Sequence, residues 1–152
     1  MVSRKPSRAV LPHAITLWNW TGKGEVGNGS KVRQYNKVYV KYMRCDETNS
    51  LAGTVNLGNL YFEIYNGVSE VRNPDGALCS YVPPHVYLNA PESRQKTLWT
   101  LNMDDDFFGI GAIADENPST GGERNRKDYI INNVDAKTGF DGSVHHWEVY
   151  GR

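Results

Sequence analysis

The sequence predicts an all-β domain, a single β-sandwich of about eight or nine short strands with no significant helix. Aromatic residues are frequent, with 9 Tyr, 4 Phe and 4 Trp, while 15 Gly and 7 Pro interrupt the short apolar runs. This mixture is typical of strands joined by tight turns. Several segments alternate apolar and polar residues with the period of two expected of half-buried strands. No segment has the 3.6-residue periodicity of an amphipathic helix.

The chain is long enough for one domain preceded by a short arm. A domain of 152 residues buries about 70% of the surface of its unfolded chain, which is enough for one core without metal ions or disulfides. Residues 1–13 contain Arg4, Lys5 and Arg8 with two prolines and few apolar residues. We therefore expect a basic N-terminal arm over 1–13 and the sandwich over 14–152.

The first strands are predicted from the clearest alternation. Residues 15–20 form the first strand, and a glycine-rich turn over 22–29 follows. Residues 36–45 alternate valines on one face with lysines on the other, which indicates a half-buried strand. A long polar connection over 45–59 then leads to a third strand over 60–65.

The middle of the chain is predicted as further short strands. They lie near residues 78–82, 86–88 and 97–101, and Pro83-Pro84 imposes an extended linker between the first two.

The C-terminal part closes the sandwich with a hairpin. A polar surface loop over 115–128 is followed by strands over 129–134 and 144–150 around the turn signal Asp141-Gly142. In an extended strand the neighbouring His145 and His146 would point to opposite faces, so we do not expect them to bind one ion together.

Three consecutive carboxylates form the densest charge in the chain. Asp104, Asp105 and Asp106 lie between two apolar runs, and no Lys or Arg occurs over 97–123. Two unit charges about 5 Å apart repel by roughly 3 kcal/mol at an effective dielectric near 20. The three acids must therefore stay solvated, raise a pKa or hold a cation. They could equally cap a turn and keep a sheet edge from pairing with other chains.

Two segments resemble C2 domains. MDDDFFGIGAI is similar to the third calcium-binding loop of that family, and CDETN followed by GNLYFEIYN is similar to the first loop. The resemblance implies a C2-like sandwich over 36–152 whose calcium ligands are Asp104, Asp105, Asp106, Asp46 and Asn59. It also implies a non-enzymatic binding module that engages an anionic membrane or a protein surface. Calcium, with six to eight oxygen ligands, is then the expected cofactor.

The charge distribution supports a second interpretation. Residues 1–44 contain nine Lys or Arg and one acid, whereas the rest contains eight bases and sixteen acids. Such a chain could dock head to tail with its own copies as a jelly-roll subunit of the virion coat or decoration type. Arg4, Lys5 and Arg8 would then contact a neighbouring subunit, or packaged nucleic acid. KVYVKYMRCDETN and DENPST are similar to plant single-stranded DNA virus coat proteins, but at a different spacing, and no prediction is based on them.

Catalysis, export and membrane insertion are not predicted. The sequence lacks HExxH, CxxC, GxSxG, the P-loop and GxGxxG, and no spacing brings carboxylates such as Glu63 and Asp106 together. No signal peptide and no run of 18 apolar residues is recognisable, so we expect a cytoplasmic or virion-associated protein. Cys45 and Cys79 could pair only if the chain were exported.

Overall fold

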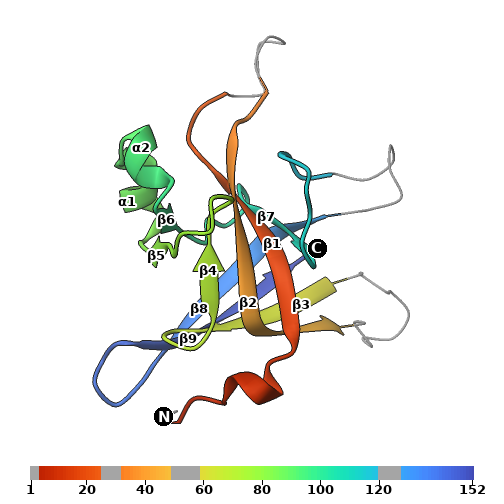
Figure 1. Ribbon diagram of the computed structural model, residues 1–152, viewed down its shortest axis with the longest axis vertical. Coiled ribbons are helices and arrows are strands. Elements are labelled where there is room, and N and C mark those ends of the chain that lie inside the picture. Colours follow the sequence, from red (N-terminus) through yellow and green to blue (C-terminus); the bar gives the residue numbers. More distant parts are fainter. Residues whose placement is uncertain (1–3, 25–31, 49–58, 120–127) are drawn as a thin grey trace.

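The computed structural model describes residues 4–24, 32–48, 59–119 and 128–152 (Figure 1). It confirms the predicted all-β sandwich, with antiparallel pairing throughout its large sheet. Most of the predicted glycine-rich turn, polar connection and surface loop lies outside the described residues. The strands are β1 (His13–Trp20), β2 (Tyr35–Thr48), β3 (Asn59–Tyr65), β4 (Glu70–Arg72), β5 (Ser80–Tyr81), β6 (Leu98–Trp99), β7 (Phe107–Ile110), β8 (Tyr129–Thr138) and β9 (Val144–Gly151).

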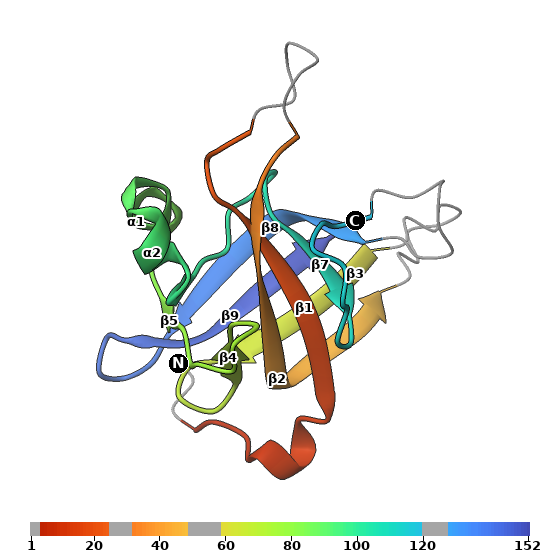
Figure 2. The same cartoon turned by 45° about the horizontal axis from the view of Figure 1, so that its top comes forward.

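Two strands pass from one layer of the sandwich to the other (Figure 2). The N-terminal part of β2 pairs with β1 and β4, and its last five residues pair with β3. Likewise, β8 begins beside β7 and continues beside β9. These two strands divide the seven-stranded sheet into two layers, which we call the first and the second sheet. The first sheet is β4-β2-β1-β7-β8, and the second sheet is β2-β3-β9-β8. Tyr42, with a φ of 58°, lies where β2 leaves the first sheet.

The core fills the space between the two sheets, as the alternation predicts. Its aromatic members include Trp99 and Trp147, whose ring centroids are 5.0 Å apart, and Phe62 and Phe108, at 4.6 Å. The other buried apolar side chains come mainly from β1, β2, β3 and β9. Burying each large apolar side chain contributes about 1.5–3 kcal/mol, so this core is the main source of stability.

The prediction of a strand near 86–88 is wrong, because α1 (Pro84–Asn89) is a short helix there. Pro84 occupies the first helical position, where its missing N–H costs nothing and its fixed φ favours the helix. The helices α2 (Glu92–Gln95) and η1 (Arg8–Val10) are shorter still. In the described part of the chain, no helix is long and apolar enough to span a membrane.

The N-terminal arm packs against the sandwich just before β1. Leu11 is buried, with 1% of its surface exposed. Arg8 donates from Nε to the carbonyl of Val68 at 3.0 Å, and its guanidinium lies 4.3 Å from the ring centroid of Tyr42. Arg4 and Lys5 are exposed. The arm is thus anchored to the sandwich from about Arg8 onward.

A β-bulge in the closing hairpin contradicts the prediction that its two histidines point to opposite faces. Thr138 pairs with Val144 and Lys137 with His146, which leaves His145 as the extra residue of β9. A bulge changes the direction of neighbouring side chains. As a result the Nδ1 atoms of His145 and His146 lie 2.8 Å apart, instead of on opposite faces.

Candidate functional site

The outer surface of the second sheet carries charged and aromatic side chains from four strands. Alternate residues of β3 face the core, so those between them line this outer surface, and β9 continues it. We call it the acidic–aromatic face. Its side chains are Arg44 and Asp46 from β2, Tyr61, Glu63 and Tyr65 from β3, His146, Glu148 and Tyr150 from β9, and Asp135 and Lys137 from β8.

Three carboxylates form one row across three neighbouring strands. Glu63 stands opposite Glu148, and Glu148 stands opposite Asp135. Like charges directly opposite each other in an antiparallel pair are destabilising. Lys137 Nζ lies 2.8 Å from Asp135 Oδ2 and compensates that end of the row. Within the described ranges, Glu63 and Glu148 form no ion pair with a Lys or Arg.

Two tyrosines hold the Glu63 carboxylate. The Tyr61 hydroxyl donates to Glu63 Oε2 at 2.6 Å, and the Tyr65 hydroxyl donates to Oε1 at 2.8 Å. Burial and the hydrogen bond to Glu63 raise the pKa of Tyr65 to about 12, and the same causes raise the pKa of Tyr61. Both hydroxyls therefore remain donors. The ring of Tyr61 also packs on that of Tyr150, with centroids 4.7 Å apart.

His146 links this row to the bulge. It is 5% exposed, and its ring stacks on Tyr65 with centroids 5.0 Å apart. His146 Nε2 lies 2.9 Å from Glu148 Oε2. If Nε2 donates this bond from a neutral ring, Nδ1 must accept from His145. His145 Nε2 then carries no hydrogen atom. It is buried and has no hydrogen-bond partner in the structure.

The residues with metal-ligating geometry belong to the same face. Glu63, His146 and Glu148 each offer one ligand atom, and these atoms lie within 4.8 Å of one another. Among the described His, Cys, Asp and Glu side chains, no other group of three meets this criterion. Carboxylate and imidazole ligands suit Zn²⁺ and related divalent ions. Experiments on this face therefore need a chelator in the buffer.

Asp106, the third acid of the acidic stretch, is an internal hydrogen-bond acceptor. Its exposure is 0%, and it accepts from the backbone N–H of Trp20 at 2.8 Å, from Asn102 N–H at 2.9 Å and from Asn19 Nδ2 at 2.8 Å. Burial raises the pKa of Asp106 to about 7, although these hydrogen bonds oppose the shift. Its carboxylate joins the end of β1 to the turn before β7.

The other two acids of the stretch have different surroundings. Asp105 Oδ1 lies 2.9 Å from Arg33 Nη1 in a partly exposed ion pair. Asp104 is exposed and has a φ of 67°, a left-handed conformation that Asp and Asn tolerate better than most residues. The three carboxylates are therefore not gathered around one point.

The four described acids among the five predicted calcium ligands do not form a metal-binding group. Asp46 is exposed on β2, and Asp46, Asp104, Asp105 and Asp106 include no three whose ligand atoms all lie within 4.8 Å of one another. Two ligands of one calcium ion lie within about 5 Å of each other. Asn59 begins β3 opposite Thr48, and its side chain is outside the described part.

Two arginines show how this chain binds guanidinium groups. Arg33 lies 4.2 Å from the ring centroid of Trp20 and pairs with Asp105. Arg8 lies over Tyr42, and its Nη2 is 3.7 Å from Glu70 Oε2. Each guanidinium thus has an aromatic ring and a carboxylate as partners.

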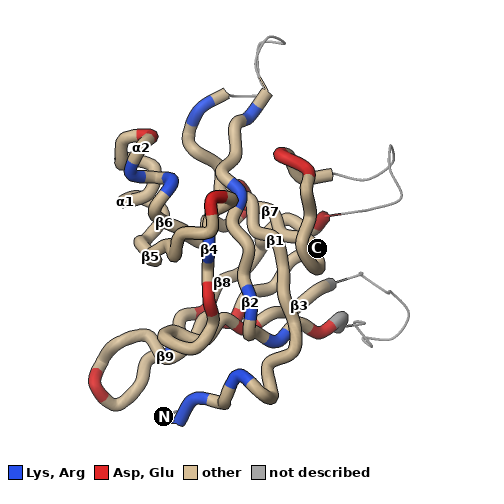
Figure 3. Tube along the Cα trace, in the orientation of Figure 1, with Lys and Arg blue, Asp and Glu red and all other residues tan. Residues whose placement is uncertain are grey.

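The outer surface of the first sheet has the opposite charge. Figure 3 shows basic positions along β2 and at the N-terminal arm. Tyr39 stands opposite Arg72 and Lys41 opposite Glu70 on β4, while Lys37 Nζ donates to the Ala114 carbonyl at 2.8 Å. With Arg8, this surface carries four bases and one acid, whereas the acidic–aromatic face carries four acids and two bases.

A cavity of about 480 Å³ opens beside the core. Tyr81, Trp99 and Trp147 line it together with Cys79, and none of its lining residues is charged. Tyr65 lies between this cavity and the acidic–aromatic face, but no charged residue of that face lines the cavity. Cys45 and Cys79 form no disulfide.

Sequence reasoning missed the acidic–aromatic face, although the sequence carries a signal for it. Tyr61-Phe-Glu-Ile-Tyr65 and His146-Trp-Glu-Val-Tyr150 place a Glu between two aromatic residues at the period of two. Only the pairing of β3 with β9 shows that the two patterns lie side by side.

No family model, no curated protein and no solved structure matches this chain.

Proposed function

We propose that this chain is a non-enzymatic structural subunit, of the virion coat or decoration type, that assembles head to tail with its own copies. The observation that carries the proposal is the separation of charge between the two sheets. A surface with four acids and two bases lies on one sheet, and a surface with four bases and one acid lies on the other.

Such a distribution favours contact between unlike surfaces of two copies. A contact of this kind is heterologous. A pair of copies therefore keeps one free surface of each type, and assembly continues into rings or filaments. Opposite charges steer the encounter of two copies. Salt weakens this attraction, because the Debye length is about 8 Å at physiological ionic strength.

The calcium-dependent, C2-like function has less support from the geometry. Asp106 already accepts three hydrogen bonds, and Asp105 pairs with Arg33. Only Asp104 of the acidic stretch is an exposed carboxylate without such a partner in the described residues.

Sedimentation velocity tests the proposal. The sedimentation coefficient of the full chain is measured over a hundredfold range of protein concentration. The measurement is made in EDTA, once at low salt and once at 0.5 M NaCl. We expect species larger than a monomer that grow with concentration at low salt and dissociate at high salt. A monomer at every concentration and salt would refute self-assembly.

A further inference from the structure

The acidic–aromatic face offers the partners that this chain uses for arginine. Arg33 and Arg8 each combine an aromatic ring with a carboxylate. Guanidinium groups favour such sites because they stack on aromatic faces and pair with carboxylates. Glu63 lies between two tyrosines, and Glu148 lies beside Tyr150 on the same surface. In the described structure, neither Glu pairs with an arginine of its own chain.

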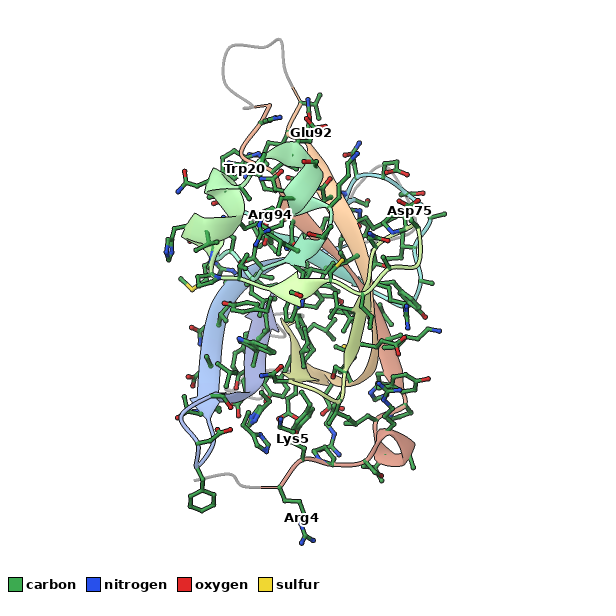
Figure 4. The ribbon with its side chains drawn as sticks, turned by 60° about the vertical axis from the view of Figure 1, so that its left-hand side comes forward. Arg4, Lys5, Trp20, Asp75, Glu92 and Arg94 are labelled. Atoms are coloured by element: carbon green, nitrogen blue, oxygen red, sulfur yellow. The ribbon has the colours of Figure 1, made fainter. Side chains whose placement is uncertain are left out.

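The N-terminal arm carries basic groups suited to this face. Figure 4 shows Arg4 and Lys5 at the end of the molecule opposite to Glu92 and Arg94 of α2. Both are exposed and form no ion pair with another described residue. In its own copy, the Lys5 ammonium lies beside the turn at Gly67 and contributes to the charge around Asp141.

The length of the two basic side chains lets them reach the row. Neighbouring strands place Glu63 and Glu148 about 5 Å apart. Pro6 favours an extended backbone at Lys5, so the side chains of Arg4 and Lys5 leave the backbone on opposite sides. Both side chains are long and have many rotamers, so an arm that lies along the row can turn both cationic groups toward it.

We infer that the arm of one copy docks on the acidic–aromatic face of a second copy. Arg4 stacks on the tyrosines and pairs with Glu63, and Lys5 pairs with Glu148. The inference rests on the proposed function and assigns the contact with the acidic–aromatic face to the arm, which adjoins the basic surface of the first sheet at Arg8. The face takes a second copy of this chain as its occupant, because the arm and the face are complementary in charge, and among the described residues Arg4 and Lys5 form no ion pair with the face of their own copy.

Two full-length double variants test the contact. Arg4→Gln with Lys5→Gln removes the charge of the arm, and Glu63→Gln with Glu148→Gln removes the charge of the face. We expect each variant alone to associate at least tenfold more weakly than the wild type at low salt. Mixed in equal amounts, the two should form a dimer that grows no further, because only one intact arm meets one intact face. Asp75→Asn and Arg94→Gln, exposed charges away from the contact, should assemble as the wild type does.

Cross-linking separates contact between copies from contact within one copy. A carbodiimide joins Lys5 to Glu63 or Glu148, and an equal mixture of ¹⁴N and ¹⁵N chains reports which copy supplied each peptide. Mixed-isotope peptides support the inference even if the face variant fails to fold. Peptides of one isotope only, or assembly unchanged in both variants, overturn it while self-assembly stands. A wild-type monomer under all conditions removes the proposed function itself.

Discussion

Replacing Asp106 by alanine should destabilise the fold strongly. The carboxylate accepts three hydrogen bonds at 0% exposure, and the donors belong to Asn19, Trp20 and Asn102. Alanine would remove the acceptor of all three donors, and only Asn19 Nδ2 would keep a second acceptor, the Thr100 carbonyl. At about 1–2 kcal/mol each, the free energy of unfolding should fall by about 3–6 kcal/mol. A domain of this size has a total of about 5–15 kcal/mol.

Urea denaturation followed by tryptophan fluorescence measures this loss. With a slope of about 2 kcal/mol/M, the midpoint should fall by about 2 M. Asp104→Asn is the matched control, because Asp104 is exposed and Asn tolerates its φ of 67°. We expect the control within about 0.5 kcal/mol of the wild type. If Asp106→Ala stays within about 1 kcal/mol of the wild type, the hydrogen-bond argument is wrong.

The pH dependence gives a second readout of the same group. Burial raises the pKa of Asp106 from 3.8 to about 7 in the folded chain. Between these values the folded state binds a proton that the unfolded state does not bind, so stability falls as pH rises through this window. The slope is about 1.4 kcal/mol per pH unit. The wild type should therefore lose more stability than Asp106→Ala between pH 4 and pH 7, and equal slopes would contradict the shift.

Three further results are expected. Gly151→Ala should lower the free energy of unfolding in urea by about 1–3 kcal/mol, because its Cβ would overlap the Phe108 ring and lie 2.9 Å from the Ile130 carbonyl. Gly76→Ala, at a site with open space, should lower it by about 1 kcal/mol or less. Calcium at a few millimolar should move the melting temperature by less than about 1 °C. A larger rise that Asp104→Asn with Asp105→Asn abolishes would instead support the C2-like function. Thiol titration should find both cysteines reduced, with Cys79 reacting slowly at pH 8 because burial raises the pKa of its thiol.

The sequence predicted what depends on local pattern. Strict alternation over 36–45 corresponds to β2, and the turn signal at Asp141-Gly142 corresponds to the hairpin between β8 and β9. Local pattern failed at α1, since Pro83-Pro84 indicates extended chain as readily as a helix start. Proline alone does not distinguish these two outcomes.

What long-range pairing decides could not be predicted. Asp106 is internal only because the turn before β7 returns to the end of β1, 86 residues earlier in the chain at Trp20. The contact between His145 and His146 depends on a bulge that appears only when β9 is aligned with β8. Carboxylates that look alike in the sequence therefore have different surroundings in the fold, and charge density in the sequence does not distinguish them.

The acidic row also has an energetic meaning for a single copy. Directly opposite like charges oppose sheet pairing by roughly 0.2–1 kcal/mol per pair, and the row contains two such pairs, Glu63 with Glu148 and Glu148 with Asp135. Arg44 stands opposite Glu63 and Lys137 pairs with Asp135, so bases flank both ends of the row, while the tyrosines that hold Glu63 orient its carboxylate without neutralising it. A cationic group from outside relieves this repulsion, so docking of a basic arm should stabilise the second sheet itself. At low salt, the extent of assembly and the melting temperature should therefore rise together. In Glu63→Gln with Glu148→Gln, the monomer should be more stable than the wild-type monomer, but its melting temperature should no longer rise with concentration.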